Sequence, residues 1–204
     1  MRVVVVGAGG HGKVVCDVLL SMGIAVDGFV DDGKPIGERV LGLPVLGNTA
    51  WLDDNASRIA LGIGDNVRRR LLAERFVKTG SELVTGIHAS AVVAPSATVG
   101  SGAVVMARAV INPDARVEAG AIINTAVVVE HDCVVGAYAH LSPSSALGGT
   151  VTIGAEVHVG LGAVVLPGMV VGAGSVVGAG AVVNKTVPER VVVRGVPARV
   201  GRSL

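Results

Sequence analysis

The chain has 204 residues, half of them apolar and only 2% aromatic, and its formal net charge is +1 at pH 7. This length fits one or two domains whose cores consist mainly of Val, Ile, Leu and Ala. Because the charge is nearly balanced and no basic patch is interleaved with aromatic residues, we expect no nucleic-acid binding. The two cysteines, Cys16 and Cys133, are too few for a disulfide framework and indicate a reducing, cytoplasmic location.

Two features bear on membranes. The amino terminus lacks the basic flank, long apolar run and cleavage site of a signal peptide. The segment 159–183 carries no charge, and its length alone would suggest a transmembrane helix. The same segment contains seven glycines and one proline, which a helix tolerates poorly. We therefore expect no membrane association.

The segment 1–85 shows the alternating pattern of an α/β fold. An apolar run over 3–6 predicts a strand, and a glycine loop then leads into a helix over 14–22. The loop reads Gly7-x-Gly9-x-x-Gly12, and Asp31 and Asp32 follow a second predicted strand over 26–30. This glycine pattern fits a dinucleotide-binding fingerprint, although such glycines can also serve only to make a tight turn.

The length of this region favours a single nucleotide over a dinucleotide. A third strand over 59–63 leads to Gly64, Asp65 and Asn66 and to a helix over 67–78, after which the pattern changes. This leaves room for only one mononucleotide-binding half. We expect the phosphates at Gly9, Gly10, His11 and Gly12, because helix starts favour anions. Further contacts are expected from Asp31, Asp32 and residues 64–66, whereas the arginines at 68–70 are interpreted as a solvated face.

From Ile87 onward the sequence repeats with a period of six. Every sixth residue up to Val183 is aliphatic, and a mostly small residue follows four places later. A hexapeptide period is typical of a parallel β-helix, in which each hexad is a short strand plus a corner. Three hexads make one 18-residue coil. Five residues share one 18-residue register and should stack along one edge of a triangular prism: Pro95, Pro113, His131, Gly149 and Pro167.

His131 is the candidate catalytic residue on this edge. Imidazole suits proton transfer near neutral pH, particularly when a carboxylate orients it, and Glu130 and Asp132 are the candidate orienting groups. Adjacent side chains on a flat strand point apart, so Asp132 reaches His131 only if a corner lies there. The alternative is a merely solvated corner histidine.

The histidine spacing predicts a site between subunits. His140 and His158 are separated by one full coil and should stack on one side of the prism. His131 and His140 are separated by half a coil, so one prism places them on opposite sides. They can share a site only if one of them comes from a neighbouring copy, and a triangular prism favours a homotrimer.

At these motifs the chain resembles the bacterial PglD-like and NeuD-like nucleotide-sugar acetyltransferases of the left-handed β-helix class. The matching segments are 7–13, 31–32, 63–66, 124–125, 130–133 and 195–199. The resemblance implies an α/β Rossmann-like βαβαβ domain over 1–85, an all-β left-handed parallel β-helix over 86–190 and a C-terminal tail over 191–204.

The resemblance also implies an activity. Acetyl would pass directly from acetyl-CoA to an amino group, most often at C4, of a UDP-, GDP- or dTDP-linked deoxysugar, without a metal. His131 would be the general base, Asp132 its carboxylate partner and Asn124 a neighbouring polar group. His11 would lie near the sugar phosphates and Asp31 or Asp32 near the nucleoside. The acetyl-CoA contacts would be His140, Gly149, Leu161 and Ala179, the last at a position where the family often has glycine.

Three alternatives stay open from the sequence. The same base and thioester site would serve O-acetylation of a sugar hydroxyl, as in sialic-acid modification. A zinc site of the carbonic-anhydrase type would need His131, His140 and His158 to converge. A non-catalytic nucleotide-sugar sensor would bind the nucleotide but not acetyl-CoA.

Overall fold

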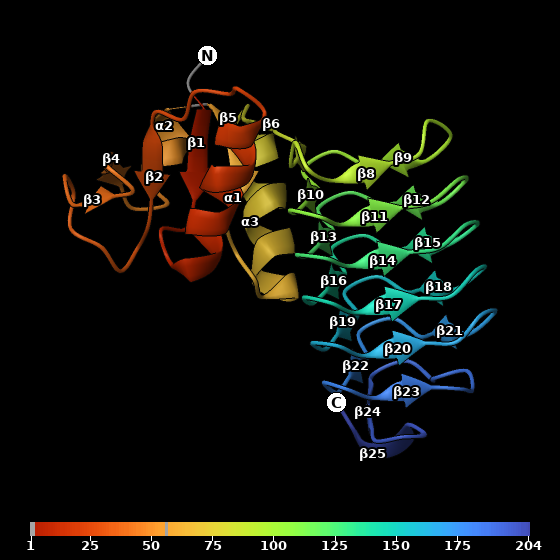
Figure 1. Ribbon diagram of the computed structural model, residues 1–204. Coiled ribbons are helices and arrows are strands. Elements are labelled where there is room, and N and C mark those ends of the chain that lie inside the picture. Colours follow the sequence, from red (N-terminus) through yellow and green to blue (C-terminus); the bar gives the residue numbers. More distant parts are fainter. Residues whose placement is uncertain (1–2, 56) are drawn as a thin grey trace.

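The computed structural model describes residues 3–55 and 57–204 and consists of an α/β part beside a long prism of stacked strands (Figure 1). The α/β part holds a six-stranded sheet in the order β3-β4-β2-β1-β5-β6. Its elements are β1 (Val3–Val6), α1 (Gly10–Ser21), β2 (Gly28–Val30), β3 (Arg39–Val40), β4 (Leu43–Gly47), α2 (Trp51–Asp54), β5 (Arg58–Leu61), α3 (Asn66–Lys78) and β6 (Glu82–Leu83).

The central strand β1 is entirely valine because both of its faces are covered. It pairs in parallel with β2 and β5, and all four of its residues are buried. Val3 and Val5 pack into the cluster that contains α1, while Val4 and Val6 pack into the cluster that contains α3. Successive side chains of a strand point to opposite faces, so this sheet has a helix layer on each side.

The prism is a parallel β-helix with three faces. The first face contains β7 (Gly86–Ile87), β10 (Val104–Val105), β13 (Ile122–Ile123), β16 (His140–Leu141), β19 (His158–Val159), β22 (Val176–Val177), β24 (Val191–Arg194) and β25 (Arg199–Ser203). The second face contains β8 (Val92–Val93), β11 (Val110–Ile111), β14 (Val128–Val129), β17 (Ala146–Leu147), β20 (Val164–Val165) and β23 (Val182–Val183). The third face contains β9 (Thr98–Val99), β12 (Arg116–Val117), β15 (Val134–Val135), β18 (Thr152–Ile153) and β21 (Val170–Val171).

The register of the prism follows the coil length that the hexads predict. Val104 pairs with Ile122, and His140 pairs with His158. The aliphatic residue of each hexad points inward, together with the mostly small residue four places later. Both sets form one continuous core, which is fully buried except in the first coil (87–99) and at Met169, where the residues are partly buried. The predicted parallel β-helix, preceded by an α/β part, is confirmed.

Each hexad from Val99 to Val177 turns at a residue in the left-handed backbone region. Glycine occupies this place in some corners, as at Gly120 and Gly162, but Asp132, Tyr138 and Thr150 adopt positive φ as well. Gly, Asn and Asp are the residues that most readily adopt this conformation. The structure shows that the coil stacking imposes this conformation on larger side chains also, including β-branched Thr150 with φ of 61°.

Residues 191–203 extend the first face beyond the hexad repeat. β24 pairs in parallel with β22, and β25 folds back antiparallel on β24.

Among the described residues, no helix is both long and apolar enough to cross a membrane.

The α/β part packs against the first face of the prism. Val15, Val18 and Leu19 of α1 share a buried cluster with Val104 and Ile122 of that face, and the ribbon shows α1 and α3 beside it (Figure 1). The edge between the second and third faces therefore lies opposite the face that the α/β part covers.

Candidate active site

His131 and Asp132 form a hydrogen-bonded pair at a corner of the prism. The corner joins β14 to β15, and Asp132 turns it with a left-handed φ of 59°. The His131 Nδ1–H donates to Asp132 Oδ2 over 2.8 Å, and both side chains are more than half exposed. Glu130 instead accepts a hydrogen bond from the backbone N–H of His131. Asp132 is therefore the carboxylate that bonds the imidazole. The sequence alone had left the choice between Asp132 and Glu130 open.

The pair makes His131 a stronger base. The hydrogen bond to Asp132 raises the pKa of His131 above its usual value of 6.5, and the charges of Asp132 and Glu130 act in the same direction. Because Nδ1 carries the proton, the lone pair of the neutral ring lies on Nε2. Nε2 can take a proton from a group that approaches this exposed edge.

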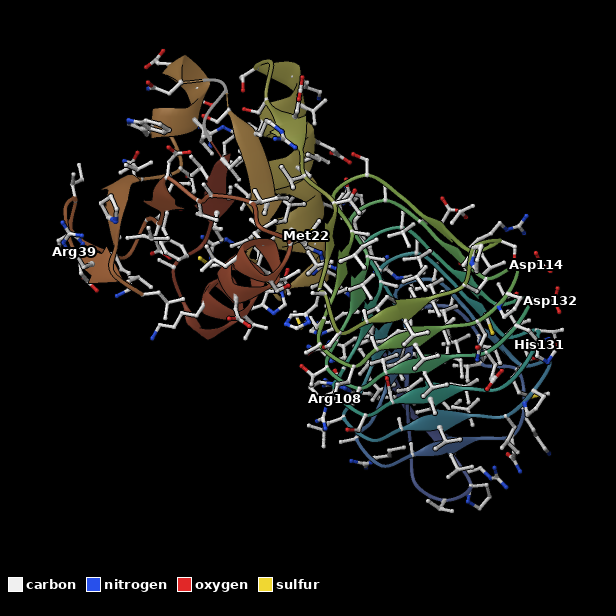
Figure 2. All side chains as sticks on the ribbon, turned by 45° about the horizontal axis from the view of Figure 1, so that its top comes forward. Met22, Arg39, Arg108, Asp114, His131 and Asp132 are labelled. Carbon is white, nitrogen blue, oxygen red and sulfur yellow. The ribbon has the colours of Figure 1, made fainter. Side chains whose placement is uncertain are left out.

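Gly149 stacks one coil away from His131, as the 18-residue register predicted. A Cβ atom on Gly149 would lie 2.6 Å from both Cε1 and Nε2 of the imidazole. The ring can take this position only because Gly149 has no side chain. Figure 2 shows His131 and Asp132 together on the side of the prism away from the α/β part.

A pocket in the α/β part collects several of the predicted nucleotide contacts. It has a volume of about 230 Å³ and is lined by Gly7, Val30, Asp31, Asp32, Gly33, Thr49, Ile63 and Arg68. Asp31 accepts hydrogen bonds from the N–H groups of Ala8 and Gly33, so it orders the glycine loop. Asp32 accepts from the Thr49 N–H, and this bond is the main cause that lowers the pKa of its carboxyl.

The glycine loop has two different roles. Gly9 and Gly10 are exposed at the amino-terminal end of α1, and an added Cβ on either would meet no atom within 4 Å. A Cβ on Gly12, in contrast, would lie 1.9 Å from the Gly7 carbonyl oxygen. Gly12 therefore lets the helix pack closely on the loop, whereas Gly9 and Gly10 leave their side open to a ligand.

Residues 64–66 mostly join the two parts of the molecule. Asp65 caps α3 by accepting from the Arg68 N–H at 2.7 Å. The Asn66 amide donates to the backbone carbonyls of Glu156 and Val157 in the β-helix. The Gly64 carbonyl also faces the β-helix, where it accepts from His140. The predicted nucleotide contacts at Gly64 and Asn66 thus lie at the contact between the two parts, and neither residue lines the pocket.

The interpretation of residues 68–70 as a solvated face is wrong for Arg69. Arg68 is exposed, and it also lines the pocket at Asp31 and Asp32, where its guanidinium lies 3.4 Å from Asp32 Oδ2. Arg69 is completely buried and donates to backbone carbonyls on both parts, including those of Gly64, Gly120 and Tyr138. A run of three arginines gives no sign of this role, since charge runs usually face solvent.

Three histidines gather where α1 meets the first face. The rings of His140 and His158 lie 4.9 Å apart, and the His11 ring lies 6.0 Å from that of His140. Burial lowers the pKa of His140 to about 3 and that of His11 to about 4. His140 donates from Nδ1 to the Gly64 carbonyl and accepts at Nε2 from the Asn124 amide, so it is held neutral in one tautomer. His11 Nε2 is buried without a hydrogen-bond partner among the described residues.

The predicted catalytic residues and acetyl-CoA contacts therefore lie in three places within one chain. His131, Asp132 and Gly149 lie on the edge between the second and third faces. Asn124, His140 and His11 lie with the α/β part at the first face. Leu161 and Ala179 stack on a different edge, between the first and second faces. The zinc alternative places the metal between subunits, because within one chain His131 lies on a different edge from His140 and His158.

Comparison with known proteins identifies the family of this chain. Residues 2–76 match the family model described as the PglD N-terminal domain. UDP-N-acetylbacillosamine N-acetyltransferase of Bacillus subtilis (strain 168) is 37% identical over 119 residues, which are 52% of this chain and 51% of that relative. The match thus spans about half the length of this curated relative.

Two solved structures match over nearly the whole length. PerB from Caulobacter crescentus, in complex with CoA and GDP-perosamine, is 43% identical with a TM-score of 0.94, covering 99% of this chain and 98% of that one. The acetyltransferase domain of PglB from Neisseria gonorrhoeae, in complex with acetyl coenzyme A, is 39% identical with a TM-score of 0.93 over 98% of both chains.

The fold and these full-length matches define a left-handed β-helix acyltransferase. At this identity and coverage, the chain belongs to the PglD-like nucleotide-sugar acetyltransferases. It is accordingly an acyltransferase with acetyl-CoA as cosubstrate, and the expected family and fold are confirmed.

Proposed function

We propose that this protein transfers acetyl from acetyl-CoA to the C4 amino group of a nucleotide-linked deoxysugar. The observation that carries the proposal is the His131–Asp132 pair seated against Gly149 at an exposed corner. PerB, whose structure contains CoA and GDP-perosamine, supports an amino sugar as the acceptor.

The transfer proceeds by direct attack. The sugar amine attacks the thioester carbonyl carbon while His131 Nε2 takes a proton from the amine nitrogen. The carbonyl oxygen gains negative charge, and the Gly149 N–H, which donates no hydrogen bond within the described residues, stabilises it. The C–S bond then breaks, and the CoA sulfur leaves as the thiol with the proton returned by His131.

The nucleotide occupies the pocket at Asp31, Asp32 and Arg68 in residues 1–85. The sugar phosphates lie against Gly9, Gly10 and His11, where the amino-terminal end of α1 attracts anions. His11 suits this place because its Nε2 is buried without a partner among the described residues and the ring is neutral at physiological pH. Residues 86–190 hold acetyl-CoA, with contacts at His140, Gly149, Leu161 and Ala179.

The complete site requires a second copy of the chain. The α/β part covers the first face of its own prism, so its nucleotide pocket cannot present a sugar to His131 on the opposite edge. Three prisms around a three-fold axis bring the His131 edge of one copy to the Asn124 and His140 side of the next. We therefore propose a homotrimer with one active site at each interface, and we retain the cytoplasmic location as a prediction.

The test is an acetyl-transfer assay with UDP-, GDP- and dTDP-linked 4-amino sugars, read by release of the CoA thiol. We expect one nucleotide class to be acetylated, and His131→Ala to lower kcat by about 10² to 10⁴-fold while the protein stays assembled. A product that survives mild alkaline treatment in mass spectrometry is an amide, whereas a labile product would indicate O-acetylation. Near-normal thiol release by His131→Ala would refute the proposed base.

A further inference from the structure

The corner hydrogen bonds of the prism are interrupted at two places. We number the places of a hexad from its aliphatic residue, so that Ile87 begins the first hexad and Val177 begins the sixteenth. In each of these hexads the carbonyl of the second residue can accept a hydrogen bond from the N–H of the fifth residue. Among the described residues, this bond closes 14 of the 16 corners. The two open corners are 130–133 and 148–151, which carry His131 and Gly149.

The thiol of Cys133 fills the open corner at 148–151. Cys133 is fully buried in the prism core, and its Sγ donates to the Gly148 carbonyl oxygen at 3.1 Å from one coil away. Burial raises the pKa of this thiol, while the backbone N–H groups of Val151 and Thr150 act on the sulfur in the opposite sense. The Gly148 carbonyl therefore accepts from the thiol instead of from the Val151 N–H, the donor that the pattern of the other corners would supply.

Two serines, Ser145 and Ser175, occupy the equivalent inward place. Ser145 Oγ donates to the Ser142 carbonyl within its own corner, and the backbone bond of that corner remains closed at 3.2 Å. Ser175 Oγ, in contrast, donates to the Pro188 carbonyl of the next coil at 2.7 Å and accepts from the Val191 N–H at 3.1 Å. A polar atom at the fifth place can therefore replace a backbone bond of the next coil, and Cys133 does so in the coil that contains Gly149.

The position of the thiol fixes the direction of a neighbouring N–H. Gly148 C=O and Gly149 N–H belong to one peptide unit, and in a trans peptide these two groups point in opposite directions. Gly148 O faces the buried thiol, so the Gly149 N–H faces outward, where the His131 ring lies against Gly149. Proline occupies the same place at 95, 113 and 167, so those coils offer no N–H on this edge.

We infer that Cys133 is a positioning residue for acetyl transfer. Its thiol holds the Gly148–Gly149 peptide so that the Gly149 N–H points to the place where the thioester oxygen becomes negative. This inference rests on the proposed function, since it assigns a support to the same oxyanion donor. A donor that is aligned before the reaction stabilises the developing charge without reorganisation.

Two variants of Cys133 separate the hydrogen bond from the packing. Cys133→Ala removes the donor but keeps the residue type that most hexads have at this place, so the fold should persist. We expect it to lower kcat about tenfold, with KM for both substrates within about twofold, because only transition-state stabilisation is lost. Cys133→Ser restores a donor and should recover most of kcat. Cys16→Ala, at the other buried cysteine, is the matched control and should leave kcat unchanged.

Unchanged kcat in Cys133→Ala, or equal loss in the Ala and Ser variants, would overturn the inference. The infrared S–H stretching band gives a second readout that needs no activity. We expect Cys16→Ala to retain a band at lower frequency than the one retained by Cys133→Ala, because Cys133 donates to a carbonyl. Coincident bands would also overturn it. If the unaltered protein transfers no acetyl to any amino sugar, the proposed function fails, and the infrared bands still decide whether the thiol bond exists.

Discussion

The chemistry of His131 depends on one residue in an unusual backbone conformation. Asp132 turns the corner with positive φ, and this brings its carboxylate back to the imidazole of its sequence neighbour. On a flat strand the two side chains would point apart. The corner thus brings an imidazole and a carboxylate from two adjacent residues into a hydrogen bond without help from a distant segment.

The pH dependence of kcat/KM should report this pair. The hydrogen bond to Asp132 raises the pKa of His131, and only the neutral ring acts as a base. Activity should therefore fall as the pH falls through that raised pKa. Asp132→Asn removes the cause, so we expect the acid limb of the profile to move to lower pH while the maximal rate falls about tenfold to a hundredfold. The measurement is a pH-rate profile of both proteins, and an acid limb that stays in place would contradict this account.

The sequence allowed His131, Asp132 and Gly149 to be placed correctly because the repeat is strictly periodic. Once the period is 18, residues 131 and 149 must stack, and the structure gives that contact. Arg69 was misjudged for the opposite reason, since its partners are backbone carbonyls that carry no sequence signal. The surroundings of His140 were also beyond prediction, because they depend on how α1 and α3 dock against the prism.

At the scale of elements, α3 joins the two parts of the molecule. Its first turn supplies Asn66, whose amide reaches the β-helix, and Arg69, whose guanidinium bonds carbonyls of both parts. Burial lowers the pKa of Arg69 to about 10, so it remains charged at neutral pH. A buried charge with several carbonyl acceptors is costly to disrupt, because removing it leaves those acceptors without partners.

Arg69→Met should therefore destabilise the protein by about 3 kcal/mol, with loss of the docking between the α/β part and the prism. Urea unfolding measures this, and two separate transitions would accompany the loss of docking. Arg75→Met is the matched control, because Arg75 lies on the same helix but pairs with Asp53 at the surface of the α/β part. Similar unfolding curves for the two variants would argue against Arg69 as the link.

The elements themselves were predicted unevenly. The strands of the prism follow the hexad pattern closely, because the same six-residue pattern repeats through 16 consecutive corners. In the α/β part, α1 begins at Gly10, four residues before the predicted start, since the glycine loop itself enters the first helical turn. The hairpin of β3 and β4 and the short helix α2 were not predicted, because two- to five-residue elements carry too little periodicity to recognise.

At the scale of the whole molecule, the two halves of the proposed site lie on opposite sides of one prism. The pocket proposed for the nucleotide lies in the α/β part that covers the first face, and His131 lies on the edge opposite that face. In a closed three-fold assembly all three interfaces are equivalent. If one pair of neighbouring copies forms a complete site, the trimer therefore contains three identical sites.

Co-expression of two inactive variants tests this claim most directly. Asp32→Ala impairs the nucleotide pocket, His131→Ala removes the base, and a different tag on each chain allows purification of mixed assemblies. If each site takes the pocket from one copy and the base from the next, a mixed trimer contains one intact site, and activity returns to about one third of the unaltered level. Mixed assemblies that stay as inactive as the two parents, or a protein that sediments as a single chain, would contradict the account.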